Sequence, residues 1–93
     1  MEAMMQGGGA CGLTRDEATE LTVQTVLGAA EMVRRTGEEP SELRRKVTSS
    51  GGTTEAALQV MDEYRLQEAI AAAVSRAAER AAELGAVMSQ TNS

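Results

Sequence analysis

An all-α fold is predicted for this 93-residue chain from two features of its sequence. Apolar residues recur every three or four positions through most of the chain, which is the period of one helix face. No segment carries the signal of a β-strand, and no internal repeat is present. The chain has one tyrosine, no tryptophan and no phenylalanine, so its core should be thin. We therefore expect a helical bundle domain that completes its core against another chain or a missing domain.

The first predicted element is a helix fragment over residues 1–6, which begins without a capping residue. Gly7 to Gly9 should break or loosen this helix, because each glycine costs about 1 kcal/mol relative to alanine. Gly12 marks a turn. Since the helix starts without a cap, we expect Met1 to lie in the middle of a longer element and the chain to be truncated.

A long helix is predicted from Thr14 to about Thr36. Thr14 and Glu17 have the spacing of a capping box, and Gly37 is a C-terminal stop. The apolar positions form two stripes, whereas a helix at the edge of a monomer usually shows one. One stripe consists of Ala18, Leu21, Thr25, Gly28, Ala29 and Met32. The other consists of Val23, Val26, Leu27, Ala30 and Val33. Burial on opposite sides is expected, which favours an interleaved homodimer.

A short helix is predicted over residues 39–47, with Pro40 in its first turn, where the fixed φ of proline suits a helix. Its last turn is basic, which we interpret as complementing the helix dipole. Another helix should end near Glu63, and Thr53 or Thr54 is expected to cap it.

A bend is predicted at Tyr64, followed by a helix over residues 66–84 with Gly85 as its cap. Residues 86–93 are small and polar and are predicted to be a disordered tail. The folded domain is thus expected to comprise residues 1–85.

The candidate site is the loop from Thr48 to Thr54, in which hydroxyl side chains flank two adjacent glycines. Glycines let a backbone turn tightly and approach a ligand closely. A turn that leads into a helix N-terminus presents unpaired N–H groups and partial positive charge, which suits a carboxylate or a phosphate. The alternative interpretation is a plain turn with a helix cap. The candidate binding residues are Ser49, Gly51, Gly52, Thr53 and Thr54.

Composition excludes several classes of function. The net charge is −5, which disfavours nucleic-acid binding. Without histidine, the chain has neither a Ser-His or Cys-His nucleophile pair nor a histidine metal site. We also expect no bound metal and no residue that acts as an acid–base catalyst. No run is long and apolar enough for a membrane span. Cys11 stands alone, which fits a reducing compartment, and we expect a cytoplasmic protein.

The residues from Pro40 to Met61 resemble the signature of pyrroline-5-carboxylate reductase. In that family a proline leads into a short helix, then a T-S-P-G-G-T-T loop, then a helix that starts with a small residue and leucine. This chain carries Leu43, Val47, Thr48-Ser49, Gly51-Gly52, Thr54, Ala57-Leu58 and Met61 in that pattern. The flanks are similar as well, through Gly12-Leu13, Arg15, Gln24-Thr25, Leu27 to Ala30, Ala73, Arg76-Ala77, Arg80-Ala81 and Glu83 to Gly85.

The resemblance implies the C-terminal dimerisation and substrate-binding domain of an enzyme that reduces 1-pyrroline-5-carboxylate to L-proline with NADPH or NADH. The family's N-terminal dinucleotide-binding domain is absent from this sequence, which has no dinucleotide motif, so the chain alone should bind no cofactor and be inactive. The Gly52, Thr53 and Thr54 N–H groups, with the Ser49 and Thr54 hydroxyls, would hold the substrate carboxylate. The cofactor carries the hydride chemistry, so the domain needs no histidine.

Ser50 replaces the family's proline in the loop. The segment from Gly7 to Gly9 contains more glycine than the family's helix has at the same place. A small stability loss is expected from Ser50, because serine leaves the unfolded chain more freedom. An alternative function is a non-catalytic helical homodimerisation module derived from the family. The preference for NADPH or NADH, assembly beyond the dimer and the origin of the truncation stay open.

Overall fold

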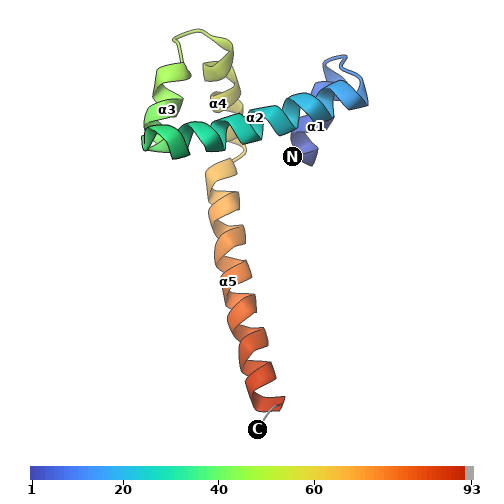
Figure 1. Cartoon of the computed structure of the whole chain (residues 1–93), viewed down its shortest axis with the longest axis vertical. Coiled ribbons are helices and arrows are strands. Elements are labelled where there is room, and N and C mark those ends of the chain that lie inside the picture. The colour runs from blue at the N-terminus through green and yellow to red at the C-terminus, as the bar shows by residue number, and fades with distance from the viewer. Residues whose placement is uncertain (92–93) are drawn as a thin grey trace. The chain divides into compact units, whose positions relative to one another are not determined.

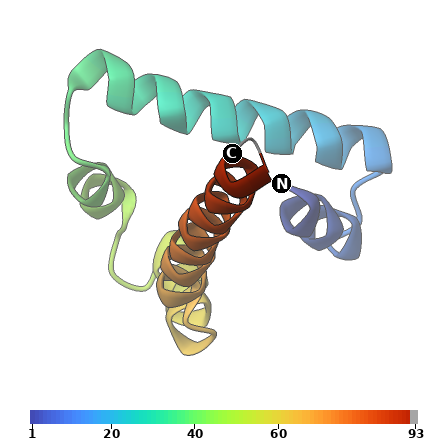
Figure 2. The ribbon, with the colours of Figure 1, turned by 90° about the horizontal axis from the view of Figure 1, so that it is seen from below.

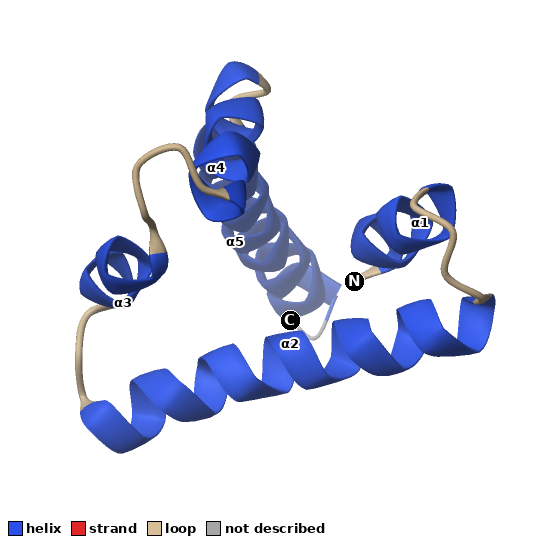
Figure 3. Ribbon diagram, turned by 90° about the horizontal axis from the view of Figure 1, so that it is seen from above, coloured by secondary structure: helices blue, strands red, loops and turns tan. Residues whose placement is uncertain are grey.

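The computed structural model describes residues 1–91, and every regular element in that range is an α-helix (Figure 1). The helices are α1 (Glu2–Ala10), α2 (Arg15–Thr36), α3 (Pro40–Val47), α4 (Thr53–Glu63) and α5 (Leu66–Thr91). The prediction of an all-α fold is confirmed. The chain divides into two compact units, residues 1–47 with α1 to α3 and the residues from Thr48 onward with α4 and α5 (Figure 3).

α1 continues through the three glycines, so the prediction that they break the helix was wrong. Gly8 is half-buried against α2, where a Cβ atom would lie 3.2 Å from the Cβ of Ala18. This close approach of the two helices compensates for the low helix propensity of glycine. The Cys11 N–H donates to the Gly7 carbonyl at 3.1 Å, and Gly12 turns the chain with φ of 101°, as expected.

α2 begins and ends as its sequence predicts. The Thr14 N–H donates to Glu17 Oε1 at 2.9 Å, and the Glu17 N–H donates to Thr14 Oγ1 at 3.2 Å. Hydrogen bonding to the Thr14 backbone N–H, and to a smaller extent to the Thr14 side chain, lowers the pKa of the Glu17 carboxyl. At the other end Gly37 adopts the left-handed conformation with φ of 67°, and its N–H donates to the Val33 carbonyl.

Burial within the chain is slight, as the composition predicts. Only Ala18 and Thr22 are buried among the residues whose exposure is described, and both lie on α2. Most apolar members of the two predicted stripes are exposed, including Leu21 at 54% and Leu27 at 57%. Burial of apolar surface stabilises a fold by about 25 cal/mol per Å². Because so little of α2 is buried, packing within its own unit adds little to the stability of this helix.

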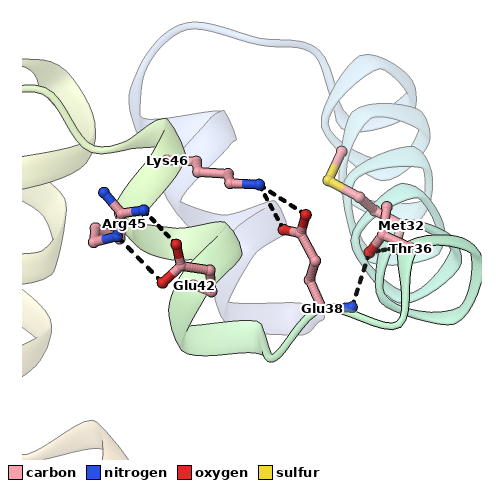
Figure 4. A network of polar contacts seen from close by, with 6 residues as sticks. All are labelled: Met32, Thr36, Glu38, Glu42, Arg45 and Lys46. Carbon is pink, nitrogen blue, oxygen red and sulfur yellow. Dashed lines mark hydrogen bonds and ion pairs between the residues drawn. The ribbon is translucent and has the colours of Figure 1, made fainter.

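Polar contacts hold the corner between α2 and α3 (Figure 4). The Thr36 hydroxyl donates to the Met32 carbonyl at 2.8 Å and accepts from the Glu38 N–H at 3.2 Å. The Lys46 ammonium donates to both carboxylate oxygens of Glu38, at 2.7 and 2.9 Å. Pro40 is the first residue of α3, as expected for a residue without an N–H.

In the second unit, α4 and α5 are joined by the bend expected at Tyr64 (Figure 2). Arg65 has φ of 55°, which is uncommon for a residue other than glycine. α5 does not stop at Gly85 but continues to Thr91, so the predicted cap was wrong. The expected tail of residues 86–93 is helical as far as Thr91, and its last two residues lie outside the described range. One glycine costs only about 1 kcal/mol, which the surrounding helix formers offset.

Candidate functional site

The loop before α4 contains a tight turn from Ser49 to Gly52. The Gly52 N–H donates to the Ser49 carbonyl at 3.0 Å, which closes the turn. Gly51 has φ of 75°, whereas Ser50 is not among the residues with positive φ. A closed four-residue turn with positive φ only at its third residue is a type II turn, which favours glycine at that position. The glycine pair therefore serves a defined backbone geometry.

Gly52 is also constrained in the size of its side chain, for a second reason. It is extended, with φ of −86° and ψ of 178°, and it is the N-cap of α4. A Cβ atom at Gly52 would lie 2.5 Å from the Ser49 Oγ and 3.2 Å from the Ser49 carbonyl oxygen. A side chain at this position would therefore displace the serine or open the turn.

No side chain caps α4, so the prediction that Thr53 or Thr54 caps it was wrong. Both threonines already lie in the helix, because the N-cap position is taken by Gly52. The first N–H groups of a helix have no intrahelical partner, and they give its N-terminus partial positive charge. The start of α4 thus keeps donors that a side-chain cap would otherwise occupy.

The predicted binding residues fall into two groups in the structure. Ser49, Gly51 and Gly52 form the turn, and the Gly52 N–H is used within it rather than facing a ligand. Thr53 and Thr54 supply the first N–H groups of α4, and Thr54 is half-buried. The arrangement offers a small anion the donors of the first helical turn, behind a backbone that the glycines shape.

Glu55 is a residue at this site that the sequence reasoning did not consider. It is half-buried in the first turn of α4, beside Thr53 and Thr54 in sequence. An acidic residue in the first turn favours the helix by complementing its dipole. It also places negative charge beside any bound anion. Its position three residues after the N-cap was visible in the sequence.

Two of the basic residues at the end of α3, Arg45 and Lys46, form local ion pairs. Arg45 pairs with Glu42, and this hydrogen bond lowers the pKa of the Glu42 carboxyl and raises the pKa of the Arg45 guanidinium. Lys46 pairs with Glu38 (Figure 4). Nearby glutamates therefore neutralise the charges of Arg45 and Lys46. This favours the interpretation that these cations complement the end of the helix rather than bind a substrate.

Cys11 is an exposed free thiol at the end of α1. Among residues 1–91, no three acidic or cysteine side chains are grouped so that they could hold a metal ion. No helix in the described part of the chain has the length and apolar character that crossing a bilayer requires.

Comparison with known proteins gives one consistent result. Residues 1–84 match the family model described as pyrroline-5-carboxylate reductase dimerisation. The chain is 47% identical to the pyrroline-5-carboxylate reductase of Pseudomonas aeruginosa, with 91% of this chain and 33% of that protein covered. It is 45% identical to the reductase of Arabidopsis thaliana, with 90% of this chain and 30% of that protein covered. It thus spans about a third of the length of the curated relatives it matches.

The fold agrees with a solved structure of the same family. The crystal structure of Plasmodium falciparum pyrroline carboxylate reductase with NADP bound superposes with a TM-score of 0.81 and 28% sequence identity. The match covers 85% of this chain and 30% of that one. By its sequence over residues 1–84 and by its helical fold, this chain belongs to the pyrroline-5-carboxylate reductase dimerisation family.

Proposed function

We propose that this chain is the dimerisation and substrate-binding part of a pyrroline-5-carboxylate reductase, an oxidoreductase of proline biosynthesis. The activity of the whole enzyme is the reduction of 1-pyrroline-5-carboxylate to L-proline with NADPH or NADH. The match of residues 1–84 to the dimerisation model carries this proposal. We place the protein in the cytoplasm, because its single cysteine provides no intrachain disulfide.

The chain forms a homodimer through its exposed apolar helix faces in this proposal. Leu21 and Leu27 of α2, and Ile70 and Val74 of α5, are each more than half exposed in the single chain. Large exposed apolar surfaces mark interaction sites in soluble proteins. Light scattering at several protein concentrations tests the proposal, and a well-folded monomer would contradict it.

The substrate carboxylate binds at the start of α4 in this proposal. The N–H groups of Thr53 and Thr54 hold it, and Ser49, Gly51 and Gly52 form the turn that positions these groups. The uncapped N-terminus of α4 and the type II turn before it support this site. Charge-assisted hydrogen bonds from N–H groups to a carboxylate are about twice as strong as neutral ones. A carboxylate held there would fix the position of the small substrate ring. Such positioning can accelerate the reaction even where the domain supplies no acid–base catalyst.

The described residues do not themselves fit a nicotinamide dinucleotide. Such a cofactor is held by a strand, a glycine-rich turn and a helix, whereas residues 1–91 contain helices alone. In this proposal NADPH or NADH is held by the dinucleotide-binding part of the whole enzyme, and we expect the chain alone to bind neither and to be inactive. The solved relative from Plasmodium falciparum was crystallised with NADP.

Nuclear magnetic resonance tests the carboxylate site on the chain itself. L-Proline, the product of the proposed reaction, should shift the amide signals of Thr53 and Thr54 in the folded dimer. Pyrrolidine is the matched control ligand, because it has the same ring without the carboxylate and should leave these signals in place. Equal shifts with both compounds, or none with either, would contradict the site.

A chimeric enzyme separates the catalytic function from a purely dimerising module. The chain replaces the matching segment of the Pseudomonas aeruginosa reductase, to which it is 47% identical. The chimera should oxidise NADPH in the presence of 1-pyrroline-5-carboxylate. A folded, dimeric chimera without activity would favour the non-catalytic alternative, provided that the parent enzyme is active in the same assay.

A further inference from the structure

We propose that the turn of α5 after residue 84 lengthens the homodimer interface beyond the segment that the family model matches, with Met88 contacting a second copy of this chain. The family match ends at residue 84, whereas α5 runs from Leu66 to Thr91. This inference rests on the proposed homodimer. It adds to it an interface segment that lies outside the matched domain.

An apolar stripe runs along α5 and continues past residue 84. Its positions are separated by four, three and four residues, and this set of spacings occurs twice in succession. An 11-residue repeat corresponds to about 3.67 residues per turn, close to the α-helical value of about 3.6, so the stripe stays on one face of the helix. Met88 therefore shares a face with Leu66 and lies one turn beyond Leu84. The stripe consists of Leu66, Ile70, Ala73, Ala77, Ala81, Leu84 and Met88.

Little in the described part of the chain covers the far end of this stripe. Leu84 is 46% exposed and Met88 is 65% exposed. Within its own unit α5 packs against α4, which joins it at the bend near Tyr64, at the opposite end of the helix (Figure 1). Helices in proteins obtain most of their stability from packing an apolar face. The exposed end of the stripe therefore indicates a partner outside this single chain.

The charged side chains of α5 pair with one another and stop before this segment. Arg76 Nη1 lies 3.1 Å from Glu83 Oε1, and Arg80 Nη1 lies 2.9 Å from Glu83 Oε2. No charged side chain follows Glu83 in the sequence. The end of the stripe thus offers apolar contact without a charge for a partner to match, which favours an equally apolar surface over a nucleic acid or an anionic membrane.

A second copy of this chain supplies such a surface. The stripe up to Leu84 lies within residues 1–84, which match the dimerisation model, and Met88 continues it without a break. In a two-fold symmetric dimer both copies use the same patch. A substitution at Met88 therefore acts twice in each dimer.

The dimer dissociation constant of the full chain tests this interface, with Met88→Gln as the variant. Methionine and glutamine have similar helix propensities, so the variant removes the apolar contact and keeps the helix. Fluorescence-detected sedimentation should show a dissociation constant raised by about ten- to a hundred-fold, because two partly buried methionines are lost from each dimer. Ala86→Gln is the matched control, since a residue two positions away lies on the other side of the helix. It should leave the dissociation constant unchanged.

Nuclear magnetic resonance on a mixed dimer locates the contact. One copy carries isotope-labelled methionine methyl groups and the other is unlabelled, and Met88→Gln identifies the Met88 signal by its loss. The Met88 methyl group should show nuclear Overhauser effects to the unlabelled copy. This measurement needs only the unaltered chain and decides the matter if Met88→Gln fails to fold.

The outcomes separate this interface from the homodimer itself. If the chain is dimeric but Met88 shows no contact with the other copy, or if Met88→Gln and Ala86→Gln have equal dissociation constants, the inference is overturned and the homodimer stands. A folded monomer refutes the homodimer and this interface together.

Discussion

Replacing Arg65 by glycine should stabilise the protein, because Arg65 holds a left-handed backbone at the bend between α4 and α5. Its φ is 55°, and an L-residue in this conformation costs about 1–2 kcal/mol. Glycine removes that cost but loses about 0.5–1 kcal/mol through its greater freedom in the unfolded chain. The ion pair between Arg65 and Glu68 is also lost, and its side chains are 74% and 65% exposed, so it contributes at most a few tenths of a kcal/mol. The expected net gain is about 0.5 kcal/mol.

Arg65→Ala is the matched control, because it removes the same ion pair and keeps the left-handed strain. Urea unfolding followed by circular dichroism, at one fixed protomer concentration, measures both variants and the unaltered chain. Arg65→Gly should exceed Arg65→Ala by about 0.5–1 kcal/mol in free energy of unfolding, with the same slope against urea. If Arg65→Ala proves as stable as Arg65→Gly, the bend is not strained in solution and the reasoning fails.

Three further measurements test other parts of the structure. Thr14→Ala should lower the free energy of unfolding by about 1 kcal/mol through loss of the α2 cap, whereas Thr14→Ser should retain most of it; equal losses would contradict the capping box. The pKa values of Glu17 and Glu42 are lowered by their hydrogen bonds in the folded chain, so their contribution is present above the ordinary carboxyl pKa and is lost as pH falls through the lowered values. Urea unfolding between about pH 6 and about pH 3 should therefore show a smaller acid loss in a Glu17→Gln, Glu42→Gln double variant, and an unchanged loss would count against these contacts. Glu55→Gln should tighten L-proline binding by about two- to five-fold, since it removes a like charge from the first turn of α4; weaker or equal binding would place the anion elsewhere.

The candidate site was only partly predictable from the sequence. The glycine pair and the hydroxyl residues marked the loop, and the family pattern around them indicated a carboxylate. That Gly52 is the N-cap of α4 was not predictable. A threonine at the N-cap and a threonine in the first helical turn look alike in the sequence, so the first residue of the helix could not be located. Only the backbone path shows that the Gly52 N–H is used by the turn and that Thr53 and Thr54 lie inside α4.

The sequence alone determined the all-α class, the capping box at Thr14, the turns at Gly12 and Gly37 and the bend at Tyr64. Each of these depends on residues a few positions apart, whose side chains or φ preferences act within one turn. The tertiary structure decided what propensity could not. Gly8 stays helical because α1 packs closely against Ala18 of α2, and a helix preference of about 1 kcal/mol per residue yields to such a contact. The same limit explains why α5 continues through Gly85.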